Sequence, residues 1–471
     1  MSKLKYLILI STHLMMAQTW NTVGSLIGDS VLTSDVLNLN LISQMKMDKH
    51  NFPVIVYVDN NKKVWVKKFV YPNWITIGSP TNFTNNIVSD VDLAIDSQNN
   101  YYIVYSDWGS VPEKKPVIKK YNGSSWETLG NDFAYFEGTI KNDIEISSND
   151  VLHFAFASTA RKLSLVTYSS NIWQNIGPPN YGMGVAEMAE FVLKLSSSGI
   201  PYVYYVENGG TGFGGNGILQ NGCYLLKATH NNWEMLGGGI VMGNSLGYPD
   251  LELWNEIPVI VFNDGNDGKT IKAIQFVNGA WSFFGGRLGG SGNAWSPGKN
   301  KVKMHNNELY ALHRGVAAYT QDLRKYNSVT NQWDLLSTFT PAVSHYISNV
   351  GNLSLEFNSS GNPFIAYNTI QDKYVSNFYG NQNVLSTDTV NTTGYNLTVF
   401  PNPISNKIQI QNHENLLIKS YSISDINGRV LISKPCDLSM KDIDVMILTK
   451  GIYTLQLETE KGLVSRKIIK N

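Results

Sequence analysis

Residues 126–130 read Trp-Glu-Thr-Leu-Gly, and this short phrase decides the fold because it recurs along most of the chain. Each copy has a tryptophan, two variable residues, an apolar residue and a glycine. Full copies begin at Trp20, Trp74, Trp126, Trp173, Trp233 and Trp281, and a weaker copy that ends in serine begins at Trp333. The copies are about 50 residues apart, a period that indicates a protein built from structural repeats.

Three further strand-like runs separate successive copies, as the interval before Trp126 illustrates. Residues 91–96 alternate between apolar and polar, residues 101–106 are aromatic and β-branched, and residues 117–121 precede the turn at Asn122 and Gly123. Runs of period two that are bounded by Asn, Asp, Gly and Ser predict strands joined by hairpins. Four strands in about 50 residues are the unit of a β-propeller blade.

The number of runs predicts how the ring closes. The copy at Trp20 has no strand before it, whereas the runs at 353–357, 363–367 and 373–379 have no phrase of their own. We therefore expect the Trp20 strand to complete the last blade, which leaves no open sheet edge at the seam. The sequence predicts an all-β protein with a seven-bladed β-propeller, six or eight blades being the alternatives, in which each repeated tryptophan packs between blades.

The bulk composition excludes some classes of function. Hydrophobic residues make up 42% of the chain, enough for a sizeable core, whereas charged residues make up only 16%. Lys plus Arg and Asp plus Glu each number 37, so no basic excess indicates nucleic-acid binding. The two cysteines, Cys223 and Cys436, fall in different predicted domains, and we expect each to be an isolated thiol.

The N-terminus has the pattern of a secretion signal. Lys3 and Lys5 precede a short apolar region, and the small residue Ala17 provides a cleavage site. Residues 1–17 are therefore predicted to be a signal peptide. No later segment has 18 consecutive apolar residues, so we expect no transmembrane segment in the mature chain.

A second β-rich segment follows a change in composition. Residues 386–395 are rich in Ser, Thr, Asn, Asp and Gly, which is typical of a linker. Beyond them, short alternating runs surround the tight-turn pair Asn427 and Gly428. Six or seven short strands in about 75 residues predict a small Ig-like β-sandwich. The expected domains are a propeller at 18–386, a linker at 387–395 and this sandwich at 396–471.

Several short motifs in the last segment occur in a characteristic order. Residues 399–403 read Val-Phe-Pro-Asn-Pro, residues 423–430 read Ile-Ser-Asp-Ile-Asn-Gly-Arg-Val, and residues 451–453 read Gly-Ile-Tyr. Together with lysines near the end of the chain, these motifs resemble the C-terminal sorting domain of the type IX secretion system. The motif residues are Pro401, Asn402, Pro403, Asp425, Gly428, Arg429, Gly451, Tyr453 and Lys467.

The resemblance implies a destination and a partner. A chain with this domain is expected to leave the bacterial cell and to be recognised by outer-membrane secretion machinery, then released or attached to the outer surface. The resemblance implies nothing about the activity of the propeller.

The expected loops of the two propeller faces differ in length and content. The turns between the first two strands of each blade are short and polar, whereas the loops on the opposite face are long and aromatic. Long loops on a rigid scaffold often carry function, and exposed aromatic rings beside amides and acids suit sugars. Five aromatic residues of the long loops are candidate ligand-binding residues: Trp108, Tyr135, Tyr181, Trp295 and Tyr319. The alternative is that these rings only pack the loops down.

Acids and amides recur where the second strand of a blade ends. They include Asp59, Asp107, Glu207, Asp264 and Asn368, and we expect them to accept hydrogen bonds from turn amides. The alternative is that they point into the top of the central channel and bind a cation or a polar ligand. Asp264 and Asp267 have the composition of a calcium loop but lack its closing glutamate. The sequence therefore predicts neither a metal nor another cofactor, and no catalytic residue is assigned.

Three hypotheses for the function remain. The first is a secreted or surface module that binds glycans or acts in adhesion. The second is a propeller hydrolase or lyase acting on polysaccharide, with its acids in the long loops. The third is a structural surface protein that binds other proteins. The absence of catalytic motifs favours the first and third.

Overall fold

The computed structural model divides the chain into two compact units, residues 1–380 and residues 381–471. It describes residues 20–23, 44–59, 63–70, 73–78, 88–109, 114–130, 138–182, 184–185, 191–206, 222–229, 231–239, 246–264, 267, 270–289, 299–315, 320–339, 353–368, 373–378, 397–412, 417–425, 430–436, 442–459 and 462–471. The predicted signal peptide at 1–17 and the predicted linker at 387–395 lie outside these residues.

The described part of the first unit forms seven four-stranded antiparallel sheets. Sheet 1 contains β2 (Gln44–Met47), β3 (Pro53–Val58), β4 (Val64–Val70) and β5 (Asn73–Thr76), and sheet 2 contains β6 (Val88–Ile95), β7 (Tyr101–Asp107), β8 (Lys115–Tyr121) and β9 (Trp126–Thr128). Sheet 3 contains β10 (Thr139–Ile146), β11 (Leu152–Ser158), β12 (Leu163–Ser169) and β13 (Ile172–Asn175), and sheet 4 contains β14 (Val192–Leu195), β15 (Pro201–Val206), β16 (Cys223–Thr229) and β17 (Asn232–Met235).

The remaining three sheets follow the same order. Sheet 5 contains β18 (Leu246–Trp254), β19 (Ile257–Asp264), β20 (Thr270–Val277) and β21 (Ala280–Gly289), and it is preceded by the 3-10 turn η1 (Leu236–Gly238). Sheet 6 contains β22 (Lys301–His305), β23 (Glu308–Arg314), β24 (Gln321–Asn327) and β25 (Gln332–Phe339). Sheet 7 contains β26 (Ser354–Phe357), β27 (Pro363–Asn368), β28 (Lys373–Phe378) and, from the start of the chain, β1 (Trp20–Thr22).

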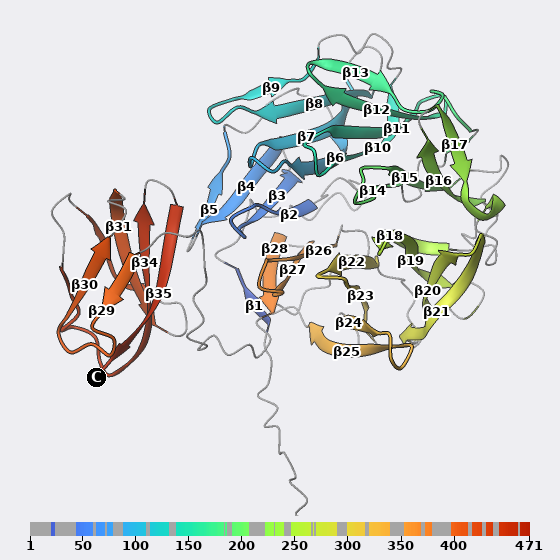
Figure 1. Cartoon of the computed structure of the whole chain (residues 1–471). Coiled ribbons are helices and arrows are strands. Elements are labelled where there is room, and N and C mark those ends of the chain that lie inside the picture. Colours follow the sequence, from blue (N-terminus) through green and yellow to red (C-terminus); the bar gives the residue numbers. More distant parts are fainter. Residues whose placement is uncertain are drawn as a thin grey trace, which may run out of the picture. The chain divides into compact units, whose positions relative to one another are not determined.

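The sheets form a closed, propeller-like ring (Figure 1). The first strand of each sheet contacts the first strand of the next, in the order β2, β6, β10, β14, β18, β22 and β26, and β26 contacts β2. The seam closes as the sequence predicted, because Trp20 in β1 is paired with Phe378 in β28.

Seven apolar clusters hold the ring together, and each lies between two neighbouring sheets. All seven residues of β7 are buried, as are all seven of β11, because neighbouring sheets cover both faces of these strands. Stability in such a ring comes from a series of contacts between neighbours rather than from one central core.

The recurring tryptophan phrase joins successive sheets. The indole N–H of Trp126 donates a hydrogen bond to the carbonyl oxygen of Ile77 at 3.0 Å. Its ring lies over Gly78, which has φ +71°, and a Cβ there would approach Trp126 Nε1 to 2.8 Å. The glycine is therefore needed for a close approach as well as for its backbone conformation. The same contact joins Trp173 to Gly130, Trp233 to Gly177, Trp281 to Gly237 and Trp333 to Gly285.

The weaker copy of the phrase is explained at the seam. Ser337 stands where the other copies have glycine, and its Oγ accepts a hydrogen bond from Trp20 Nε1 at 3.0 Å. A side-chain hydroxyl thus replaces the backbone carbonyl as acceptor where the two ends of the ring meet.

The short turns between the first two strands of each sheet define one face, the short-turn face. Neighbouring turns are hydrogen-bonded to one another, as in Lys49 N to Asn99 Oδ1 (3.1 Å) and Ser97 N to Asp150 Oδ1 (2.8 Å). At the seam, Ser359 N donates to Asn51 Oδ1 at 2.7 Å. These short polar turns therefore link neighbouring sheets of the ring. We expect ligand-binding residues on the opposite face, which has the long loops.

The second unit contains two small sheets around one core. One sheet has β29 (Leu397–Phe400), β30 (Lys407–Asn412) and β33 (Asp442–Asp444), and the other has β32 (Val430–Pro435), β31 (Ile418–Asp425), β34 (Gly451–Thr459) and β35 (Gly462–Lys470). Side chains of both sheets, such as Ile408, Ile423 and Leu455, are fully buried in the shared core. Sequence reasoning missed the short strand β33. No helix among the described residues of the chain is long and apolar enough to cross a membrane.

Candidate functional site

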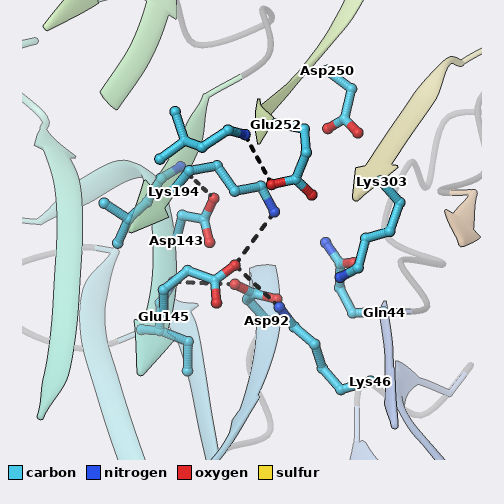
Figure 2. Close-up of polar contacts among 12 residues, drawn as sticks. Gln44, Lys46, Asp92, Asp143, Glu145, Lys194, Asp250, Glu252 and Lys303 are labelled. Atoms are coloured by element: carbon cyan, nitrogen blue, oxygen red, sulfur yellow. Dashed lines mark hydrogen bonds and ion pairs between the residues drawn. The ribbon is translucent and has the colours of Figure 1, made fainter. Parts of the chain in front are cut away.

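A ring of alternating charges lies on the first strands of the sheets of the first unit, and Figure 2 shows its members except Glu356. Its members occupy the same position of successive first strands, two residues before the short turn. They are Lys46, Glu145, Lys194, Glu252, Lys303 and Glu356, and we call them the axial charged ring. The seventh position, in β6, is the neutral Ala94. Since an odd number of positions cannot alternate in sign throughout, one neutral residue lets every remaining neighbour have the opposite charge.

Ion pairs link members of the axial charged ring. Glu145 Oε1 lies 3.1 Å from Lys46 Nζ and 3.5 Å from Lys194 Nζ. Lys303 Nζ lies 2.9 Å from Glu356 Oε1. The Lys46–Glu145 pair spans β6, where Ala94 has only a methyl group. These side chains are about one-fifth exposed, so the pairs are only partly screened by water.

The charges fix each other's protonation. Burial alone would raise the pKa of Glu145, but the ammonium groups of Lys46 and Lys194 outweigh burial and lower this pKa to about 2. Burial alone would lower the pKa values of both lysines, but Glu145 and the other carboxylates around each lysine together outweigh burial, and both pKa values are raised above the usual range. Lys46, Glu145 and Lys194 therefore stay charged at neutral pH.

A second set of side chains lies two residues earlier on the same strands and joins neighbouring first strands. Asp92 Oδ2 accepts a hydrogen bond from Ile144 N at 3.1 Å, and Asp143 Oδ2 accepts one from Leu193 N at 2.8 Å. Asp250 and Ser354 accept in the same way from Val302 N and Met45 N. Each first strand is the inner edge of its sheet, and these acceptors satisfy edge N–H groups that the sheet leaves unpaired.

Asp143 also faces another carboxyl group. Burial, together with a hydrogen bond and charge repulsion from Asp92, raises the pKa of Asp143 well above its usual value. Two buried carboxyls that share a site favour one proton between them. Both are nevertheless engaged by backbone N–H groups, which explains them as structural acceptors.

Sheet 6 buries a histidine, His313 in β23, that no sequence motif indicated. His313 is fully buried, its Nδ1 lies 2.8 Å from Arg314 O, and Arg324 Nε donates to its Nε2 at 3.2 Å. Burial, reinforced by the Arg324 charge, lowers the pKa of His313 to about 4. The neutral imidazole thus orients the guanidinium.

Two of the acids at the ends of second strands, Asp59 and Asp107, accept hydrogen bonds from turn amides as expected. Asp59 accepts from Lys63 N at 2.8 Å and from Trp65 Nε1 at 2.8 Å. Asp107 accepts from Gly109 N at 3.0 Å. Asp264 and Asp267 instead both pair with Lys272 Nζ, at 2.8 and 2.9 Å. Glu207 lies outside the described residues. No group of three or more metal-ligating side chains occurs in the described part of the chain.

Two of the five aromatic candidates lie among the described residues. Trp108 follows β7 and remains 36% exposed, and its indole N–H donates to Ser89 Oγ at 2.9 Å. Tyr181 is half-buried and packs against Trp233, with ring centroids 6.1 Å apart. This contact matches the alternative in which the ring packs the loop down. Tyr135, Trp295 and Tyr319 lie outside the described residues.

The surroundings of Trp108 combine several polar groups. The ammonium of Lys114 lies 4.1 Å from the centroid of the Trp108 ring, a cation–π contact. Ser89 Oγ, which accepts from the indole, donates in turn to Asp90 Oδ2 at 2.9 Å. Asp90 has φ +50° at a bulge where β6 changes register against β7. Bulges commonly redirect side chains at functional edges.

In the second unit, the sorting-motif residues fix the ends of strands. Asn402 Nδ2 donates to the carbonyl oxygen of Lys467 at 2.9 Å, and Asn402 Oδ1 accepts from Ile469 N at 2.8 Å. The Tyr453 hydroxyl donates to Thr449 O at 2.8 Å. Asp425 is paired with Tyr453 across β31 and β34, and Gly451 with Lys470 across β34 and β35. Pro401 and Pro403 flank Asn402, whereas Gly428 and Arg429 lie outside the described residues.

Comparison with known proteins identifies the second unit. Residues 398–471 match the secretion system C-terminal sorting domain, so the chain carries the sorting signal of an exported protein, either secreted or attached to the cell surface. No curated protein matches the chain.

Solved structures similar to the first unit share a propeller-like fold at low identity. An ulvan lyase of polysaccharide lyase family 25 is 11% identical, with 76% of this chain and 96% of that chain covered and a TM-score of 0.47. The SapL1 lectin, solved with α-methyl fucoside, is 12% identical, with 66% and 100% covered and a TM-score of 0.42. A lectin of Aleuria aurantia, solved with a fucose-containing disaccharide, is 11% identical, with 59% and 88% covered and a TM-score of 0.40. These likenesses concern the fold alone.

Proposed function

We propose that the mature protein is a seven-bladed β-propeller that binds glycans outside the cell, followed by an Ig-like β-sandwich that directs its export. In this proposal the signal peptide at 1–17 is removed, the propeller spans 18–386, and a linker at 387–395 joins it to the sorting domain at 396–471. The sorting domain engages outer-membrane secretion machinery.

One observation carries the glycan proposal. Trp108 is exposed on the long-loop face, yet its orientation is fixed by the hydrogen bond to Ser89 and by the ammonium of Lys114. A held, exposed indole offers a flat apolar surface on which a pyranose can stack, with polar groups beside it for the hydroxyls. The other aromatic candidates of this face, Tyr135, Trp295 and Tyr319, extend the proposed surface, whereas Tyr181 contributes mainly to packing.

A glycan array probed with the full mature chain tests the proposal. We expect binding to a restricted set of glycans, with Trp108→Ala binding at least tenfold more weakly. Absence of binding to any glycan would contradict the proposal.

Incubation of each bound glycan with the protein, followed by analysis of the products, separates a binding module from a hydrolase or lyase. Release of shorter products would show that the protein is an enzyme and would contradict the binding-module proposal. If no glycan is bound and a surface protein is captured instead, the structural alternative stands.

A further inference from the structure

A continuous polar circuit surrounds Trp108 at the junction of sheets 2 and 3. The Ser89 hydroxyl both accepts from the Trp108 indole at 2.9 Å and donates to Asp90 at 2.9 Å, so its hydrogen-bonding capacity is largely used. It therefore serves to fix the indole and the carboxylate relative to each other rather than to contact a ligand.

The next sheet completes the circuit with a cation. Lys141, in β10 of sheet 3, places its Nζ 3.7 Å from Asp90 Oδ1, and the two side chains are 21% and 19% exposed. A separation of 3.7 Å exceeds hydrogen-bonding distance, so neither group saturates the other. Both remain able to bond a ligand that reaches this edge.

The backbone at this junction is strained in a way that aims Asp90. Its φ of +50° is uncommon for a residue other than glycine, and it coincides with the register shift between Ser89 and Asp92. Such strain costs about 1–3 kcal/mol and persists where surrounding structure enforces it, commonly at binding sites.

A buried acceptor lies at the same junction of sheets 2 and 3. Asn142 is 8% exposed, its Nδ2 donates to Ser106 Oγ at 2.9 Å, and its Oδ1 has no hydrogen-bond partner among the described residues. Ser106 is paired with Ser89 across β7 and β6. An unpaired buried amide oxygen costs about 1–3 kcal/mol, so a donor from outside the protein, such as a bound water, is expected beneath the circuit.

We propose that Trp108, Asp90 and Lys141 form one binding site for an uncharged pyranoside, an inference that rests on the proposed glycan-binding function. The pyranoside stacks on the face of the Trp108 ring opposite the Lys114 ammonium, its hydroxyls donate to the Asp90 carboxylate, and another hydroxyl accepts from the Lys141 ammonium. The Lys114 ammonium over Trp108 is a second cation of the site, but the hydroxyls of the stacked sugar face Asp90, whose carboxylate would repel an acidic sugar. The site therefore favours uncharged over uronic acid residues.

A related junction supplies a comparison within the same chain. Between sheets 5 and 6, Asn300 is also buried with an unpartnered Oδ1 among the described residues, and Tyr248 has φ +47° at an equivalent bulge. No tryptophan among the described residues is exposed beside that bulge. We therefore assign the saccharide site to the junction of sheets 2 and 3.

The experiment uses the full mature chain and a panel of methyl pyranosides, four uncharged and one glucuronide, with binding followed by saturation-transfer NMR and by titration. Asp90→Asn keeps the shape and is compatible with positive φ, so the fold is preserved while the charge is lost. We expect at least one uncharged glycoside to bind, Asp90→Asn and Lys141→Met each to weaken it about tenfold, and Trp108→Ala to abolish it.

Phe283→Ala is the matched control. Phe283 is 53% exposed and has Lys272 Nζ 5.0 Å from its ring centroid, so it is an exposed ring beneath a lysine but lies on an outer strand. This variant should bind like the wild type. Tighter binding of the glucuronide, or wild-type affinity in Trp108→Ala or Asp90→Asn, would overturn the inferred site while leaving glycan binding intact. A wild-type chain that binds neither these glycosides nor any arrayed glycan would overturn the proposed function itself.

Discussion

Replacement of Glu145 by glutamine tests how much the axial charged ring stabilises the propeller. Glu145 is the one member paired with two lysines, at 3.1 and 3.5 Å. A pKa that falls from 4.5 to about 2 corresponds to about 3 kcal/mol of preferential stabilisation of the carboxylate by the fold. We therefore expect Glu145→Gln to lower the free energy of unfolding by about 3 kcal/mol at pH 7, since two partly buried ammonium groups lose their counter-charge.

The direction of the Glu145 pKa shift determines how this stabilisation depends on pH. Because the pKa of Glu145 is lower in the folded state, its contribution is fully present above about pH 4.5 and is lost as the pH falls toward 2. The difference between wild type and Glu145→Gln should therefore shrink over this range. All tryptophans of the chain lie before residue 381, so urea unfolding followed by tryptophan fluorescence reports on the first unit.

The matched control is Glu356→Gln. Glu356 occupies the same ring position and has one ion pair, with Lys303 at 2.9 Å, so its loss should be smaller. A loss below about 0.5 kcal/mol for Glu145→Gln, or a difference from wild type that stays constant between pH 7 and pH 3, would refute the electrostatic account.

Three further changes test other features. Gly130→Ala should lower the free energy of unfolding in urea by about 2–4 kcal/mol, because its Cβ would approach an indole nitrogen to 2.3 Å. Gly123 also has positive φ but has nothing within 4 Å of such a Cβ, so Gly123→Ala should lower it by about 1 kcal/mol. Equal losses in the two variants would contradict the packing argument. Since the pKa of His313 is lowered to about 4 in the folded state, the unfolded state binds a proton at this histidine at higher pH than the folded state does. The free energy of unfolding of the wild type should therefore fall by about 3 kcal/mol between pH 6.5 and pH 4, and His313→Gln should lack this pH dependence. Asn402→Ala, which removes two hydrogen bonds to β35, should speed amide exchange of residues 467–469 and reduce export. The exposed Asn406 of the same segment supplies the control, Asn406→Ala, and unchanged exchange in Asn402→Ala would be inconsistent with the assigned role.

Much of the ring was predictable because its signals are local and repeated. The recurring tryptophan phrase, the strands bounded by turn residues and the unpaired strand at Trp20 together predicted the sheet order and the pairing of β1 with β28 that closes the ring. The sorting domain was recognisable for the same reason, since its motifs are short and fixed in order.

The candidate sites were less predictable. The sequence predicted Trp108 as an exposed aromatic loop residue, but it did not predict its partner Ser89 or the strained Asp90. A β-bulge does not change the alternation of apolar and polar residues enough to be recognised in the sequence. The axial charged ring did have a signal: a charged residue stands two positions before the short turn in six of the seven repeats. Within one strand, however, such a residue is indistinguishable from an ordinary solvent-facing charge.

The amino-acid sequence by itself determined the repeat, the direction of export and the strand content, because these depend on residue type and spacing along the chain. Only the tertiary structure decided which charges face each other and which side chains meet at the junction of sheets 2 and 3. Lys46 in sheet 1 and Glu145 in sheet 3 have the whole of sheet 2 between them in the chain, and the arrangement of the first strands around the axis brings their charged atoms to 3.1 Å. Contacts of this kind depend on how the sheets stack around the axis, which no local pattern encodes.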